Sequence, residues 1–281
     1  MIDTGLRDKV VLITGANNPL GIGAAAARAL ASQGARVCIT YLRLAPEPFG
    51  LDQTEIEQAE QARQPGLALY HAMRTHPADE VLQSIRTAGE QAQAREVDLS
   101  NPGAIPALFD WAEDTFGPVD VLVNNAAHYE EPDTLFTVTA GSLERTFGVN
   151  TQASVLLSAE FVRRYQSRQG SFGRIINLST DAAQVFAGQI TYGASKAAME
   201  AFTRSLAMEL GPLGITVNAV APGPVQTGYI SCSFEEELRQ EIPLRRIGQP
   251  EDIANAIVFL ASSQASWLTG QVIKVSGGHA L

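Results

Sequence analysis

The chain has 281 residues, of which 45% are apolar and 18% charged, as expected of a soluble protein with one large or two small domains. The net charge is −10 and basic residues form no stripe or tail, which argues against a nucleic-acid surface. No apolar run reaches the roughly 20 residues that cross a membrane, no secretory signal opens the chain, and two cysteines are too few for a disulfide framework, so we expect a cytoplasmic protein.

Strand-like apolar runs alternate with helical stretches along the chain. The expected strands are residues 10–14, 36–41, 93–97, 119–123, 174–178, 215–220 and 272–275. The expected helices are residues 21–33, 78–88, 105–116, 141–166, 192–210 and 250–261. This alternation predicts an α/β fold, with a doubly wound parallel sheet of the Rossmann type and helices on both faces.

A glycine-rich segment, TGANNPLGIG at residues 14–23, follows the first expected strand. Glycines let a backbone approach a diphosphate, and the N-terminus of the following helix attracts anions. Gly15 stands six positions before Gly21, which is wider than the G-x-G-x-x-G fingerprint allows. The segment is therefore either an enlarged phosphate-binding loop or a merely flexible one.

Residues 44–77 interrupt the alternation with a segment rich in Glu, Gln, Ala and Pro that has no strong periodicity. We interpret it as an insertion after the second strand, with one helix around residues 53–63. A solvated excursion or subunit contact is the favoured interpretation. The alternative is a flap near the adenosine end of a bound nucleotide.

Small and polar residues follow several expected strands, where ligands bind in sheets of this type. They are Asp98 and Leu99, the run from Asn124 to Ala127, Ser179 and Thr180, and Pro222 and Gly223. Further along, YGASK places Tyr192 and Lys196 four positions apart, on one face of a helix. A phenol titrates near ~10, and a nearby ammonium lowers that pKa, so this pair could exchange a proton with a carbonyl or alcohol oxygen. Ordinary packing of a tyrosine beside an exposed lysine is the alternative.

Taken together, TG…GIG, NNA, the strand-end serine, YxxxK, PG and the ending RRIGQPEDIANAIVFLASSQASWLTGQVIKVSGG resemble the short-chain dehydrogenase/reductase family. The resemblance covers the chain apart from residues 44–77. It implies a single NAD(P)-binding Rossmann domain over residues 1–281, a variable substrate lid at 227–247, and a small-molecule carbonyl or alcohol substrate. It also implies a homo-oligomer, either a tetramer or a dimer.

The resemblance further assigns catalytic roles to four residues. Tyr192 would be the acid/base, and Lys196 would lower its pKa and hold the nicotinamide ribose. Ser179 would orient the substrate oxygen, although counting forward from the strand selects Thr180 instead. Asn150 would hold a helix kink and a water that feeds protons through Lys196.

The cofactor is expected to be NADP(H) rather than NAD(H). An acidic residue that would bind the ribose 2′-OH of NAD is missing from the end of the second strand, where Arg43 could pair with a 2′-phosphate. An exposed strand-end cation is the alternative for Arg43. The full set of expected cofactor-binding residues is Gly15, Asn17, Leu20, Gly21, Ile22, Gly23, Tyr41, Leu42, Arg43, Asp98, Leu99, Asn125, Ala126, Ala127, Tyr192, Lys196, Pro222, Gly223, Val225 and Thr227.

These expectations predict an NADP(H)-dependent oxidoreductase that interconverts a carbonyl and an alcohol. One alternative is a dinucleotide-binding protein with little or no catalysis. Another is an enoyl reductase, because the long first loop resembles that branch of the family, although its Tyr and Lys are spaced more widely. His128 could contact the substrate, but a structural hydrogen bond is the favoured interpretation. No cluster of residues has the spacing of metal ligands, so no metal is expected.

Overall fold

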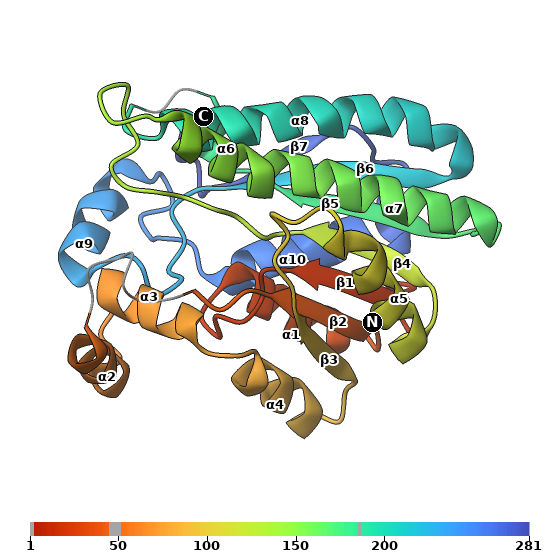
Figure 1. Cartoon of the computed structure of the whole chain (residues 1–281), viewed down its shortest axis with the longest axis horizontal. Coiled ribbons are helices and arrows are strands. Elements are labelled where there is room, and N and C mark those ends of the chain that lie inside the picture. The colour runs from red at the N-terminus through yellow and green to blue at the C-terminus, as the bar shows by residue number, and fades with distance from the viewer. Residues whose placement is uncertain (1–2, 45–51, 185–186, 281) are drawn as a thin grey trace.

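One parallel sheet lies between two layers of helices in the computed structural model, which describes residues 3–44, 52–184 and 187–280 (Figure 1). The strand order is β3-β2-β1-β4-β5-β6-β7, and every neighbouring pair is parallel. The order reverses between β1 and β4, so a crevice opens where these two strands end. The expected doubly wound fold in a single domain is confirmed. The strands are β1 (Val10–Thr14), β2 (Arg36–Tyr41), β3 (Ala92–Glu96), β4 (Val119–Asn124), β5 (Gly173–Leu178), β6 (Ile215–Pro222) and β7 (Val272–Val275).

Each face of the sheet has its own apolar core. Val11 and Ile13 of β1 pack with α1 (Ile22–Ala31), α4 (Asp79–Thr87) and α10 (Pro250–Ala261). Leu12 of β1 instead packs on the opposite face, because successive side chains of a strand point to opposite sides. That face is covered by α5 (Ala104–Phe116), α7 (Ser154–Ser167) and α8 (Ile190–Leu210). Burial on both faces explains why short continuous apolar runs form these strands.

Several elements differ from the expected ones. Residues 141–166 were expected to form one helix, but they comprise α6 (Ala140–Phe147), a π-helical turn η2 (Gly148–Ala153) and α7. A π turn uses the same residue types as an α-helix, so periodicity does not reveal it. The edge strand β3 also begins one residue before its expected start.

The inserted segment forms two helices rather than one. Helix α2 (Gln53–Ala62) matches the expected helix, and a capping box between Asp52 and Glu55 begins it. Helix α3 (Leu67–Thr75) was not expected. Residues 45–51 of the segment lie outside the described residues. Figure 1 places α3 beside the carboxyl ends of β1 and β2, near α9 (Cys232–Glu241) of the expected lid.

Three short 3-10 helices complete the described chain. They are η3 (Asp181–Ala183), η4 (Gly211–Leu213) and η5 (Ser263–Ala265). In the part of the chain that the structure describes, no helix combines the length and apolar character needed to span a membrane.

Candidate active site

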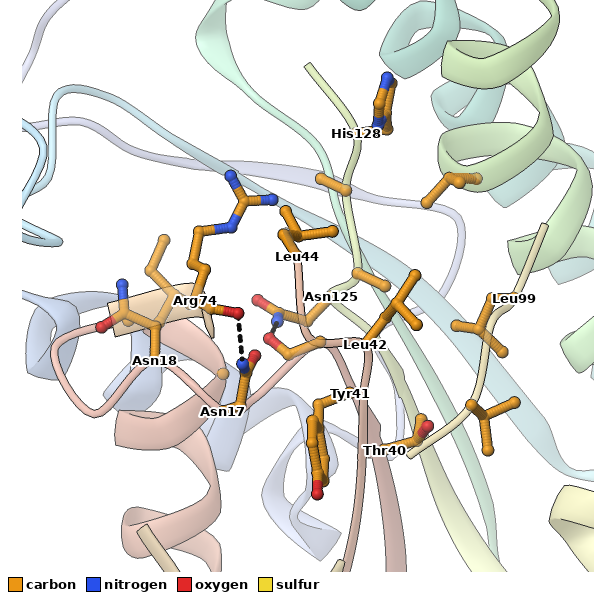
Figure 2. A pocket seen from close by; sticks show the side chains of 18 of the residues that line it. Asn17, Asn18, Thr40, Tyr41, Leu42, Leu44, Arg74, Leu99, Asn125 and His128 are labelled. Carbon is orange, nitrogen blue, oxygen red and sulfur yellow. Dashed lines mark hydrogen bonds between the residues drawn. The ribbon is translucent and has the colours of Figure 1, made fainter. Parts of the chain in front are cut away.

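A cavity of about 230 Å³ lies at the carboxyl ends of β1, β2, β3 and β4 (Figure 2). Many of the expected cofactor-binding residues line it: Gly15, Asn17, Gly21, Ile22, Gly23, Tyr41, Leu42, Asp98, Leu99, Asn125, Ala126, Ala127 and Thr227. The sequence reasoning missed other lining residues, namely Asn18, Thr40, Leu44, Tyr70, Arg74, Val97 and Val149. Tyr70 and Arg74 come from the inserted helix α3, which therefore borders the cavity.

The glycine loop is shaped by close contact between the ends of β1 and β4. Gly15 has φ +69°, and a Cβ there would lie 2.6 Å from the Cα of Ala126. A Cβ on Gly23 would lie 2.5 Å from Nδ2 of Asn125. That amide donates to the carbonyl oxygens of Thr14 at 2.8 Å and Gly15 at 2.7 Å. Only glycine fits at both positions without moving the backbone.

The first turn of α1 is open toward the cavity. Its N-cap, Gly21, has no side chain to accept hydrogen bonds from the first amide groups of the helix. These amides and the helix dipole favour an anion at this end. The loop is therefore built to accept a diphosphate, and the residues present fit a dinucleotide.

Arg43 lies outside the residues that line the cavity. Its guanidinium group pairs with Glu96 at 2.8 Å, and its Nε donates to both oxygens of that carboxylate. The charge expected to meet a 2′-phosphate is thus already paired in this structure.

Six other expected cofactor residues do not line the cavity, Tyr192 and Lys196 among them. Leu20 packs against the apolar cluster of α2 and α3, and Val225 is buried in the main core. The backbone of Gly223 lies close to Ser276. A Cβ added to Gly223 would lie only 2.8 Å from the Cβ of Ser276. Pro222 ends β6, paired with Val275. The contacts of these last four residues in this structure are packing contacts.

Tyr192 and Lys196 lie together on the first turns of α8. The ammonium nitrogen of Lys196 is 5.8 Å from the centroid of the Tyr192 ring and donates to the carbonyl oxygen of Leu178 at 2.7 Å. Lys196 is only 2% exposed, and this burial lowers its pKa to about 7.

The pKa of Tyr192 is shifted upward, not downward as expected. Burial is the largest cause, and the charges of Tyr70 and Asp181 add to it. A hydrogen bond with Thr180 acts in the opposite direction. Lys196 does not offset the burial, because its ammonium group is directed at a backbone carbonyl and is itself desolvated. The phenol is therefore protonated at neutral pH.

The two candidate hydroxyl residues after β5 have different partners. Ser179 donates to Oε1 of Glu200 at 2.6 Å, and it is 5% exposed. Thr180 instead acts on the Tyr192 phenol, whose pKa it lowers, and its Oγ1 accepts from the backbone N–H of Ala182 at 3.3 Å. Both residues continue the extended backbone of the strand, so their side chains point to opposite sides. The structure brings Thr180, and not Ser179, to the phenol.

Asn150 lies in the π-helical turn η2 and is fully buried. Its Nδ2 donates to the carbonyl oxygen of His128 at 3.0 Å and to Oγ of Ser195 at 2.9 Å. Its Oδ1 accepts from the backbone N–H of His128 at 2.7 Å. Asn150 therefore ties the loop after β4 to the residue that precedes Lys196.

His128 lines the cavity, and its ring is hydrogen-bonded to Glu130 at 2.7 Å. Arg145 also binds Glu130, and together these partners, Arg145 foremost, lower the pKa of Glu130 to about 2. The structural hydrogen bond that the sequence favoured for His128 is present.

A buried carboxylate that the sequence reasoning missed begins helix α8. Asp133 is 5% exposed and accepts hydrogen bonds from the backbone N–H groups of Thr191 and Tyr192 at 3.0 Å. It also accepts from the hydroxyl of Thr191 at 2.8 Å. Asp133 thus acts as an N-cap from a distant loop and positions the backbone of Tyr192.

Four tyrosines from separate segments form two edge-on pairs that are joined through Glu131. Tyr129 packs edge-on against Tyr192, with ring centroids 5.3 Å apart, and Tyr70 packs similarly on Tyr229 at 5.5 Å. The hydroxyls of Tyr129 and Tyr229 each donate to Oε1 of Glu131 at 3.0 Å. Burial, followed by Glu131, raises the pKa of Tyr229 to about 12. No local motif marks these residues, since the tertiary fold alone brings them together.

Potential metal ligands are not clustered in the structure. Among residues 3–44, 52–184 and 187–280, no three His, Cys, Asp or Glu side chains are grouped to hold an ion.

Comparisons with known proteins agree with this geometry. A family model described as Enoyl-(Acyl carrier protein) reductase matches residues 56–280. The chain is 36% identical to an uncharacterized oxidoreductase of Bacillus subtilis, YjdA, over 97% of both chains. It is 35% identical to NADPH-dependent aldehyde reductase 1, chloroplastic, of Arabidopsis thaliana, over 97% of this chain and 86% of the relative.

A solved structure is similar over nearly the whole fold. A short-chain dehydrogenase/reductase from Serratia marcescens superposes with a TM-score of 0.78 and 29% identity, covering 98% of this chain and 99% of that one. The glycine loop, the Tyr192–Lys196 pair and the parallel sheet are thus found in a chain that matches this family over its length. The chain belongs to the short-chain dehydrogenase/reductase family of NAD(P)-dependent oxidoreductases.

Proposed function

We propose that the protein is an NADP(H)-dependent reductase that interconverts a carbonyl and an alcohol, with Tyr192 as the acid/base. The observation that carries this proposal is the position of the Lys196 ammonium group, 5.8 Å from the centroid of the Tyr192 ring, with Thr180 acting on the same phenol. Asn150 connects this pair to the dinucleotide cavity, because it is hydrogen-bonded both to Ser195, which precedes Lys196, and to His128, which lines the cavity.

Each residue then has a role that its chemistry allows. Thr180 holds the substrate oxygen beside the phenol, and Tyr192 donates its proton to that oxygen. Because burial raises the pKa of Tyr192, the proton is present at neutral pH, which suits the direction of carbonyl reduction. Lys196, with a pKa lowered to about 7, can return a proton to the phenol. When bound, the nicotinamide supplies the hydride that the carbonyl carbon receives.

NADP(H) is the proposed cofactor for two reasons. Tyr41, Leu42 and Arg43 place no carboxylate at the end of β2 to repel a 2′-phosphate. The Arabidopsis thaliana relative is also named as NADPH-dependent. A 2′-phosphate would compete with Glu96 for Arg43, and calorimetry with NADPH and NADH measures the preference.

The test is the loss of NADPH absorbance with a panel of aldehydes and ketones. We expect turnover with at least one carbonyl compound. Tyr192→Phe should lower kcat by at least about 100-fold, because it removes the proton donor. NADPH affinity, measured separately by calorimetry, should remain within about threefold of the wild-type value. A Tyr192→Phe variant with full activity would exclude Tyr192 as the acid.

An enoyl reductase is the second candidate, because the matching family model carries that description and the glycine loop is long. The four-residue spacing of Tyr192 and Lys196 favours carbonyl chemistry. Conjugated enoyl thioesters in the same assay separate the two activities. Reduction of the C=C bond alone would replace the proposed function with this one.

Assembly as a homotetramer or dimer is part of the proposal. Several large apolar side chains are exposed on the single chain, including Phe136 and Trp267 at 97% and Met208 at 81%. A contact with other copies of the chain would bury such surface. A cytoplasmic location is proposed as well, since Cys38 and Cys232 are both free thiols.

A further inference from the structure

The inserted helices α2 and α3 pack directly onto the glycine loop. Their small apolar cluster consists of Ile56, Leu69, Ala72 and Met73, and Leu20 of the loop packs against it. The insertion is therefore attached to the wall of the dinucleotide cavity by buried apolar contacts.

Hydrogen bonds hold α3 across both walls of this cavity. At its carboxyl end, Nδ2 of Asn17 donates to the carbonyl oxygens of Arg74 at 3.2 Å and His76 at 2.9 Å (Figure 2). At its amino end, the N–H of Gly66 donates to the carbonyl oxygen of Gly228 at 2.8 Å. Asn18 donates to the carbonyl oxygen of Thr227 at 3.1 Å and joins the same two walls. Helix α3 thus bridges the glycine loop and the segment after β6.

Arg74 presents its guanidinium group from α3 to the cavity. The group lies 4.9 Å from the centroid of the Tyr70 ring. In the view of Figure 2, Leu44 is the labelled side chain next to it, and it is directed away from Tyr41 and so away from the end of β2. Within the described residues, the ion pairs use other arginines, and no carboxylate pairs with Arg74.

Among the described residues that line the cavity, Arg74 is the one arginine or lysine. The loop TGANNPLGIG has no basic residue, and the whole chain carries a net charge of −10. The N-terminus of α1 offers only about half an elementary charge to a diphosphate that carries two. Arg43 is paired with Glu96.

On the basis of the proposed dinucleotide-dependent function, we propose that Arg74 of the inserted helix α3 binds the diphosphate of the cofactor. The insertion then closes over the cofactor and supplies the counter-charge that the glycine loop lacks. A guanidinium group suits this role because it donates two parallel hydrogen bonds to phosphate oxygens. Arg74 also lies in the last turn of α3, where a cation stabilises the helix, so a purely structural role is the alternative that the experiment must exclude.

The experiment measures NADPH and NADH affinity by calorimetry for the wild type, Arg74→Met and Arg63→Met. Arg63 is a matched control, because it belongs to the same insertion but does not line this cavity. Arg74→Met should weaken both coenzymes by about tenfold or more, and by the same factor, because both carry the diphosphate. Arg63→Met should bind both as the wild type does.

Arg74→Lys keeps the positive charge. It tests whether the weaker coenzyme binding of Arg74→Met comes from the lost charge or from a change in the fold. We expect Arg74→Lys to bind both coenzymes more tightly than Arg74→Met does. The two variants should have the same thermal midpoint of unfolding. A methionine variant with wild-type affinity, or one whose weaker binding comes with a lower thermal midpoint that the lysine variant restores, would assign Arg74 to helix structure and overturn the proposal. Weakening of NADPH alone would also overturn it, because the contact would then be with the 2′-phosphate. A wild type that binds neither coenzyme would instead refute the proposed function.

Discussion

The neighbouring hydroxyls of Ser179 and Thr180 illustrate how much a shift of one residue changes at a strand end. Counting back from Tyr192 selects Ser179, and counting forward from the strand selects Thr180. The extended backbone directs Ser179 to Glu200 and leaves Thr180 to act on Tyr192. At this scale, the direction of a side chain determines whether a residue can reach the substrate.

Two substitutions separate the roles of these hydroxyls. Thr180→Val keeps the shape of the side chain but removes the hydroxyl, and it should lower kcat by at least about tenfold. Ser179→Ala should change kcat by less than about threefold and lower the free energy of unfolding by about 1 kcal/mol, the usual contribution of one hydrogen bond. Steady-state kinetics and urea unfolding measure these effects. The reverse result in kcat would make Ser179 the substrate-binding hydroxyl.

At the scale of the elements, the glycine loop is held by the approach of β1 to β4. The hydroxyl oxygen of Thr14 accepts hydrogen bonds from the backbone N–H groups of Asn125 and Ala126 at 3.0 Å. The side-chain amide of Asn125 donates to the carbonyl oxygen of Gly15. The N-terminus of α8 depends in a similar way on Asp133 from a distant loop. The shape of each functional element is thus determined by a neighbour that is remote in sequence.

Gly15→Ala tests this close approach, with Gly89→Ala as its control. Both glycines have positive φ, +69° and +84°, but an added Cβ meets the backbone of Ala126 at Gly15 and nothing within 4 Å at Gly89. Gly89→Ala should lower the free energy of unfolding by about 1 kcal/mol, from backbone strain alone. Gly15→Ala should cost more than about 2 kcal/mol, because the two strand ends must also separate.

Denaturant unfolding of the two variants, together with NADPH binding, measures these effects. The Gly89→Ala variant should bind NADPH normally. Equal losses of stability in the two variants would show that the contact with Ala126 adds nothing to the strain.

For the whole molecule, the buried Lys196 makes stability depend on pH. Its pKa is about 7 in the folded protein and about 10.5 in an unfolded chain. Between these values the unfolded state binds more protons, so the contribution of Lys196 to the free energy of unfolding rises with pH. The rise is at most about 1.4 kcal/mol per pH unit. Below pH 7 the lysine is protonated in both the folded and the unfolded state. The loss of folding stability caused by burying its charge is then at its maximum and no longer changes with pH.

A comparison with Lys196→Met isolates this effect, because the other titrating groups are shared. The stability of the methionine variant relative to the wild type should be greatest at pH 7 and decrease steadily toward pH 9.5. Urea unfolding at several pH values measures the difference. A difference that does not change with pH would mean that Lys196 keeps an ordinary pKa in the folded protein.

Much of the fold follows from local sequence. The bounds of β1, β2, β7 and α10 coincide with the expected ones, because apolar runs and flanking glycines or prolines mark where buried elements begin and end. Helix α3 escaped prediction because LALYHAMRT has weak periodicity and its apolar face packs on another insertion helix and the glycine loop. The π turn at Gly148–Ala153 has no sequence signal of its own.

The sequence by itself indicated where most strands and helices lie, the position of the glycine loop and the four-residue spacing of Tyr192 and Lys196, since each follows from residues close together in the chain. Only the tertiary structure decided that Thr180 acts on the phenol and that Glu96 forms an ion pair with Arg43. It also decided that the insertion brings Tyr70 and Arg74 to the cavity. The physical reason is the range of the interactions. Backbone periodicity and turn formation act over a few residues, whereas side-chain partners and burial depend on segments that meet only after the chain has folded.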